Sequence, residues 1–161
     1  MRKHIVCREK QIASKIVKQL FKSKYSSGMV SEMGKISYKK RKIIDTPEKA
    51  ASCFSIISNK QQEHFAILTL DAARQFINSH IVTIGTLTSS IVHPREVFAL
   101  ALEDRAASII IAHNHPSGNL DISVQDRKVT DIMKKAGELM NIPMDDHLIV
   151  TENEFRSVPG E

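Results

Sequence analysis

The pattern of hydrophobic and polar positions along the chain predicts helices and strands that alternate. Apolar residues recur at three- and four-residue spacing over residues 124–140, which predicts a long amphipathic helix. Short apolar runs of strand length occur at residues 65–70, 80–86, 108–112 and 147–151. Pro47 and Pro94 suit the first turns of two more helices, the first running to about residue 57. This order predicts an α/β fold with one mixed β-sheet flanked by helices.

The length and composition of the chain fit such a domain. With 161 residues, 42% of them hydrophobic, the chain can enclose a core, and we expect one main domain. Cys7 and Cys53 are far apart, which argues against a disulfide framework and suits a reducing cytoplasm. The sequence has neither a recognisable signal peptide nor an apolar run long enough to span a membrane. These features predict a cytoplasmic protein without a membrane partner.

Basic residues gather near the N-terminus. Residues 1–44 hold 13 lysines and arginines against two acids, whereas the remaining 117 residues hold ten against 16. We therefore expect a basic N-terminal helix and linker arm over residues 1–44 and a separate domain over residues 45–161. A basic amphipathic helix can bind nucleic-acid phosphates, or it can pack its apolar stripe on the domain and leave its lysines solvated. We favour packing and keep DNA as the alternative partner.

Four polar residues after the strand predicted at 108–112 carry the candidate chemistry. They follow the pattern H-x-H-x7-S-x-x-D and are His113, His115, Ser123 and Asp126. Residues i and i+2 of a strand project to the same face, so the two imidazoles can approach one point. Asp126 falls in the first turn of the helix predicted at 124–140, where the helix dipole favours a carboxylate. Two imidazoles and one carboxylate are a common ligand set for catalytic zinc, which keeps a fourth position for water.

Each half of this pattern also has a simpler interpretation. Ser123 and Asp126 have the spacing of a capping box, in which the two side chains satisfy backbone N–H groups at a helix start. His113 and His115 alone could be ordinary polar loop residues. The four residues together are far more specific than either pair, and we interpret them as a metal site.

Three further segments make the chain resemble a known family. Residues 93–97 are HPREV, residues 113–118 are HNHPSG and residues 146–150 are DHLIV. With the pattern above, they resemble the JAMM motif of the Jab/MPN zinc metalloproteases, and more narrowly the bacterial RadC family, historically labelled DNA repair proteins. The resemblance covers about residues 45–155. One departure is Ile122, where many members of the family have proline.

The resemblance implies a fold and a set of roles. It implies a Jab/MPN, or cytidine-deaminase-like, architecture with one zinc ion per chain, held by His113, His115 and Asp126. It also implies that Ser123 stabilises an oxyanion and that a glutamate just before an early strand acts as the general base. Glu63 has that position, immediately before the run at 65–70, whereas Glu96 and Glu103 fall inside a predicted helix. His93 and His147 lie in the family segments, and we interpret both as structural.

These implications favour a zinc-dependent hydrolase of metallopeptidase or isopeptidase type, whose substrate is an unidentified peptide or isopeptide. The alternative is a DNA-associated accessory protein that binds through its basic arm and has a structural or vestigial zinc site. Action of the same site on a phosphodiester is a third hypothesis, although nucleases commonly use two metals.

Overall fold

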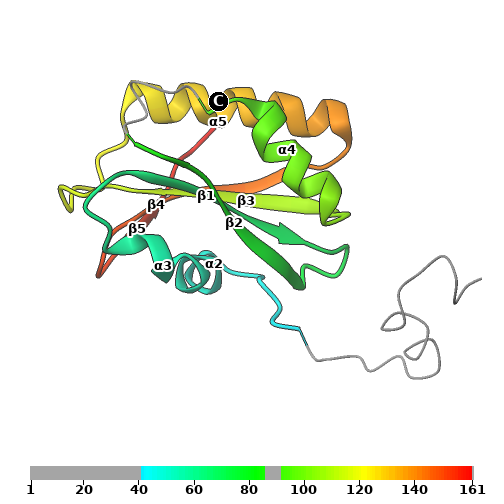
Figure 1. Cartoon of the computed structure of the whole chain (residues 1–161), viewed down its shortest axis with the longest axis horizontal. Helices are drawn as coiled ribbons and strands as arrows, with labels where there is room; N and C mark the ends of the chain where they lie inside the picture. Colours follow the sequence, from blue (N-terminus) through cyan, green and yellow to red (C-terminus); the bar gives the residue numbers. More distant parts are fainter. Residues whose placement is uncertain (1–40, 86–91, 161) are drawn as a thin grey trace, which may run out of the picture. The chain divides into compact units, whose positions relative to one another are not determined.

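Three layers make up the part of the chain that the computed structural model describes, residues 41–85 and 92–160. A β-sheet forms the middle layer, with α4 and α5 on one face and α2 and α3 on the other (Figure 1). The strands are β1 His64–Leu70, β2 Phe76–Ile84, β3 Ser108–Asn114, β4 Met144–Val150 and β5 Phe155–Ser157. The helices are α2 Pro47–Cys53, α3 Ser55–Ser58, α4 Pro94–Glu103 and α5 Val124–Met140. The basic helix expected within residues 1–44 lies outside the described residues.

The sheet is mixed and has the strand order β2-β1-β3-β4-β5. Strand β3 is central, antiparallel to β1 and parallel to β4, while β2 and β5 pair antiparallel at the edges. Every residue of β1 and β3 is buried, as expected for central strands covered on both faces. The α/β fold with a sheet flanked by helices is therefore confirmed.

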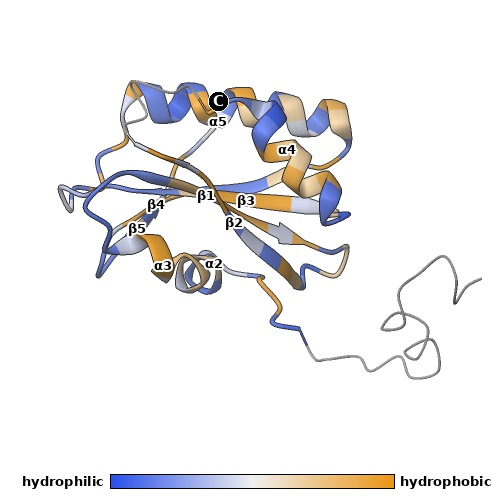
Figure 2. Cartoon of the chain, viewed as in Figure 1, coloured by the Kyte–Doolittle hydropathy of each residue, from blue (hydrophilic) through white to orange (hydrophobic). Residues whose placement is uncertain are grey.

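The alternation of side chains along the strands divides the core into two clusters. Toward α4 and α5, residues such as Phe65, Ile111 and Met133 form one cluster. Toward α2 and α3, residues such as Ala112, Leu148 and Phe54 form the other. Figure 2 shows the matching alternation of hydrophobic and hydrophilic positions along α5. This two-sided packing fixes the register of β3, because a slip by one residue would exchange its two faces.

Each longer helix begins where a side chain caps it. The Thr46 hydroxyl accepts from the Lys49 backbone N–H, His93 Nδ1 accepts from the Arg95 N–H, and Ser123 caps α5. The structural interpretation of His93 is thus supported by its capping contact. At its other end, α5 stops at Asn141, which adopts a left-handed conformation with φ of 55°.

Some element boundaries differ from those predicted. The helix expected from Pro47 to about residue 57 divides into α2 and α3 at Phe54. Strand β2 begins at Phe76 rather than near residue 80. The sequence pattern did not indicate this start, because the strand is half exposed and its first residues are a mixture of polar and apolar types. Strand β4 begins at Met144, earlier than predicted, because the two aspartates that follow Met144 interrupt the apolar pattern. The three-residue strand β5 was not predicted.

One glycine allows α5 to approach the following turn. A Cβ atom on Gly137 would lie 2.6 Å from the carbonyl oxygen of Ile142 and 3.4 Å from the ring of Phe98. The backbone at residues 142–144 leads directly into β4, so this contact sets the position of α5 against the sheet.

We expect Gly137→Ala to lower the free energy of unfolding by on the order of 1–2 kcal/mol, because overpacking against backbone outweighs the better helix propensity of alanine. Urea unfolding followed by circular dichroism measures the change, with Glu138→Ala, at an exposed neighbour, as the control. A Gly137→Ala protein at least as stable as wild type would show that the backbone is not tightly packed there.

Candidate metal centre

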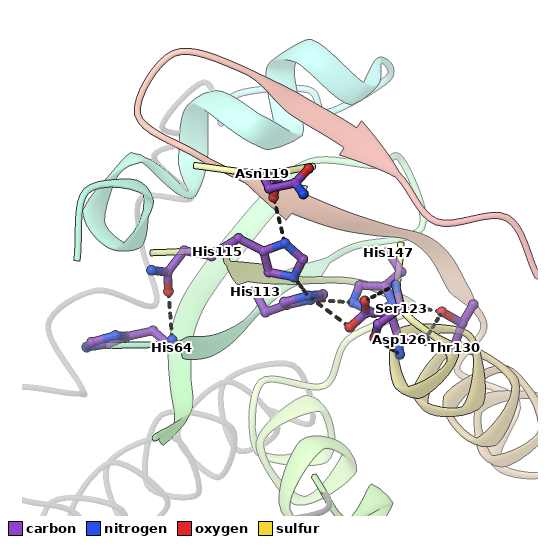
Figure 3. A network of polar contacts seen from close by, with 9 residues as sticks. His64, His113, His115, Asn119, Ser123, Asp126, Thr130 and His147 are labelled. Atoms are coloured by element: carbon purple, nitrogen blue, oxygen red, sulfur yellow. Dashed lines mark hydrogen bonds and ion pairs between the residues drawn. The ribbon is translucent and has the colours of Figure 1, made fainter. Parts of the chain in front are cut away.

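Two histidines and one aspartate converge at the end of the central strand. His113 lies in β3, His115 just beyond its end, and Asp126 in the first turn of α5 (Figure 3). The Nε2 atom of His113 is 3.0 Å from Nε2 of His115 and 3.1 Å from Oδ1 of Asp126. One potential ligand atom from each residue lies within 4.8 Å of the others. These three residues are the predicted ligand set, and the structure brings them together.

The backbone after β3 determines where His115 points. The His115 N–H donates to the Val150 carbonyl of β4, and a turn closes with the Gly118 N–H donating to the His115 carbonyl. Gly118 has φ of 76°, a left-handed value that favours glycine. His115 Nδ1 lies 2.7 Å from the Asn119 carbonyl, which can only accept, so Nδ1 carries the proton and Nε2 presents its lone pair to His113.

The two interpretations of Ser123 and Asp126 turn out to be compatible. A capping box is present: Asp126 Oδ2 accepts from the Ser123 N–H at 2.7 Å, and Ser123 Oγ accepts from the Asp126 N–H at 3.1 Å. The other carboxylate oxygen of Asp126, Oδ1, faces His113. One aspartate therefore caps α5 with one oxygen and completes the cluster with the other.

Opposing effects act on the charge of Asp126. Burial raises the pKa of its carboxyl, but the nearby His113 and the hydrogen bond from Ser123 outweigh burial and hold the pKa well below its ordinary value. Asp126 is therefore ionised at neutral pH although it is only 1% exposed. A buried carboxylate of this kind needs a positive partner close to Oδ1.

The donor set fits a zinc ion by distance and by chemistry. Tetrahedral zinc with bonds of about 2.0–2.1 Å to nitrogen and oxygen separates its ligand atoms by about 3.3 Å. Two of the three separations within the cluster, 3.0 and 3.1 Å, are close to this value, and the third, between His115 and Asp126, is within 4.8 Å. Two imidazoles and one carboxylate also leave one position of such an ion for water or substrate. The cluster could therefore hold a metal ion.

His147 of β4 contacts this site. From the sequence, only a structural role was expected for it. Its Nε2 is 2.9 Å from Nδ1 of His113, and its Nδ1 is 2.7 Å from the hydroxyl of Thr130 in α5. Burial, followed by the neighbouring His113, lowers the pKa of His147 well below its ordinary value, and the charge of Asp126 opposes this only in part. The signal in the sequence was weak: a histidine within an apolar run next to the strand that carries the ligands.

The predicted base Glu63 precedes β1 and is half buried. It lies two residues before Phe65, the residue of β1 that pairs with His113. Glu63 is not among the residues that converge within 4.8 Å. The competing Glu96 and Glu103 are exposed on α4, as expected for surface charges.

Asn114, between the two histidines, ties the segment that carries Glu63 to β3. Its side chain is fully buried and makes three hydrogen bonds. The Oδ1 atom accepts from the His64 N–H at 2.7 Å, and Nδ2 donates to the carbonyls of Lys60 and Gln62 at 3.0 and 3.1 Å. The residues on both sides of Glu63 are thereby attached to the ligand strand.

An α/β sheet with this cluster at the start of a flanking helix is consistent with a JAB/MPN-type domain. Residues 44–161 match the family model described as the RadC-like JAB domain. The chain therefore belongs to the RadC-like JAB domain family, as the sequence motifs predicted.

Curated relatives are proteins named UPF0758. One from Thermosynechococcus vestitus is 41% identical over 132 residues, covering 79% of this chain and 53% of the relative. Others from Chlorobaculum tepidum and Methanospirillum hungatei are 46% and 48% identical, covering 63% of this chain and 46% and 45% of the relatives. The chain thus spans about half the length of the curated relatives it matches, and their names state no activity.

Within 41–85 and 92–160, every helix is too short or too polar to cross a bilayer.

The buried His147 should make stability depend on pH. With its pKa lowered in the folded protein, His147 stays neutral there, while the unfolded chain takes up a proton below about pH 6.5. The free energy of unfolding of metal-free protein should therefore fall as the pH is lowered from 7 to 5, by up to about 1.4 kcal/mol per pH unit for this proton. His147→Gln should remove that part of the slope in urea unfolding with a chelator present. Equal slopes in the two proteins would contradict a neutral buried His147.

Proposed function

We propose that this domain is a zinc-dependent hydrolase that cleaves an amide or isopeptide bond. The observation that supports the proposal most is the convergence of His113, His115 and Asp126 within 4.8 Å. The likeness to the RadC-like JAB family agrees with it. The chain spans about half the length of its curated relatives. What we say of the activity of the whole protein is therefore also a proposal.

Each residue of the site would have a distinct role. His113, His115 and Asp126 would hold the ion, which when bound lowers the pKa of a coordinated water toward about 7 and polarises a carbonyl. Glu63 would accept a proton from the attacking water and return it to the leaving amine. The exposed Ser123, at the start of α5, would donate a hydrogen bond to the developing oxyanion. The substrate would be a peptide or isopeptide carbonyl, in keeping with a leaving amine that needs a proton.

Metal binding is the first test. Protein dialysed with zinc and then freed of excess should carry about one zinc per chain by mass spectrometry. His113→Ala and Asp126→Asn should lose it, because each removes a ligand atom or its charge, and asparagine can still cap α5. Glu63→Gln and the control His80→Ala, whose ring bonds Asp104, should retain it. A folded wild-type protein that takes up no zinc would contradict the proposal.

Turnover is the second test. Zinc-loaded protein should release amine products from a library of peptides and isopeptide-linked peptides analysed by mass spectrometry. On any substrate found, Glu63→Gln should lower the rate by about 10² to 10⁴-fold, the usual contribution of a general base. Ser123→Ala should lower it by about 10² to 10³-fold, and Ser123→Thr, which keeps a hydroxyl and a cap, should retain most of it.

Two results would change the proposal. Full activity of Glu63→Gln would show that another group is the base. Salt-sensitive DNA binding that survives removal of the metal, with no hydrolysis in the library, would favour the accessory protein of the sequence analysis instead.

A further inference from the structure

We propose that His147 and Thr130 are positioning residues that fix the tautomer of His113, so that His113 always presents the lone pair of Nε2 to the metal. This inference rests on the metal site proposed above, but not on hydrolysis. It assigns a function to two buried polar residues that belong neither to the ligand set nor to the proposed catalytic pair.

A continuous line of hydrogen bonds connects the three residues inside the domain (Figure 3). His113 and Thr130 have no exposed surface, and His147 is 1% exposed. The line runs from His113 Nδ1 to His147 Nε2 at 2.9 Å, and from His147 Nδ1 to Thr130 Oγ at 2.7 Å. It ends where Thr130 Oγ donates to the backbone carbonyl of Asp126 at 2.8 Å.

The last acceptor sets the direction of every bond in the line. A backbone carbonyl can only accept, so the single hydroxyl proton of Thr130 points to Asp126. Thr130 Oγ must then accept from His147, which places the ring proton of His147 on Nδ1. A neutral imidazole carries one N–H and one lone pair, so His147 Nε2 is an acceptor. His113 must therefore donate from Nδ1, and in the neutral imidazole its Nε2 then keeps a lone pair.

This direction is the one that a metal site requires. His113 Nε2 faces His115 Nε2 and Asp126 Oδ1 at 3.0 and 3.1 Å. His115 is held in the same tautomer by the Asn119 carbonyl. Both imidazoles thus direct lone pairs, together with a carboxylate oxygen, at one region, where only a cation can satisfy all three.

The arrangement also links two ligands through elements that are distant in sequence. Metal-binding histidines commonly donate their second N–H directly to a carboxylate or a backbone carbonyl. Here the imidazole of His147 lies between His113 and the final acceptor. That acceptor is the backbone carbonyl of Asp126, itself one of the proposed ligands. The orientation of His113 in β3 is thereby coupled to β4 and to the first turns of α5.

The decisive variants alter Thr130, because they leave the side chains of His147 and of the three proposed ligands intact. Thr130→Val keeps the shape but removes the hydroxyl, so His147 loses the acceptor that fixes its tautomer. Thr130→Ser keeps the hydroxyl. The matched control is Thr69→Val, which removes another buried threonine hydroxyl, one that bonds Asp104 outside the cluster. His147→Phe removes the acceptor of the His113 proton altogether.

Two measurements that need no substrate test the proposal. Competition with a chromophoric chelator gives the zinc dissociation constant, and we expect Thr130→Val and His147→Phe to weaken binding about 10- to 100-fold. Thr130→Ser and Thr69→Val should bind like wild type. In metal-free protein, nitrogen-15 NMR of the ring of His113 should show the Nδ1–H tautomer in wild type and a mixture of tautomers in Thr130→Val.

The outcomes separate this proposal from the hydrolase. Wild-type affinity together with an unchanged His113 tautomer in folded Thr130→Val would overturn it. Weakening by Thr69→Val equal to that by Thr130→Val would also overturn it, since loss of a buried hydroxyl would then suffice. If zinc binds and the variants behave as expected but no amide is cleaved, the hydrolase fails while the positioning role of His147 and Thr130 stands.

Discussion

The site depends on one constraint: polar side chains buried in an otherwise apolar layer must satisfy one another. His113, Asp126, Thr130 and His147 lie between the sheet and α5, each at most 1% exposed. An unpartnered polar group at such depth costs about 1–3 kcal/mol, and a charge costs more. Among the described residues, every buried side-chain nitrogen or oxygen lies within hydrogen-bond distance of another polar atom. Since these partners come from β3, β4 and α5, the polar contacts fix how the three elements sit against each other.

The start of α5 shows how local and tertiary requirements meet in one residue. A capping box is a local device that a short peptide can form, and it uses Oδ2 of Asp126. The proposed ligand function uses Oδ1, which the same capping hydrogen bonds orient toward His113. A ligand supplied by a capped helix start is held more rigidly than one on a free loop, which is what precise metal geometry demands.

The sequence predicted the elements that carry strong local signals. The apolar stripe of α5, the buried run of β3 and the spacing of His113, His115 and Asp126 depend on neighbours in the chain, and all three lie as expected. The start of β2 and all of β5 are defined by pairing with a partner strand, so composition did not mark them. The contact of His147 with His113 depends on the parallel register of β3 and β4, which one sequence does not reveal. The domain boundary near residue 44 stays a prediction, as does the arm.

Asn114 has a consequence for how this site can vary. It is the residue between the two histidines, and its side chain emerges on the opposite face of β3 to hold the carbonyls of Lys60 and Gln62 and the N–H of His64. The three consecutive residues 113–115 therefore set two separations at once, that between the imidazoles and that between the imidazoles and the Glu63 segment. An insertion or deletion within them would turn the amide of residue 114 toward α4 and α5, and would turn an imidazole toward the segment of residues 60–64. The tripeptide thus behaves as a single geometric unit, in which the middle residue is no freer to change than its neighbours.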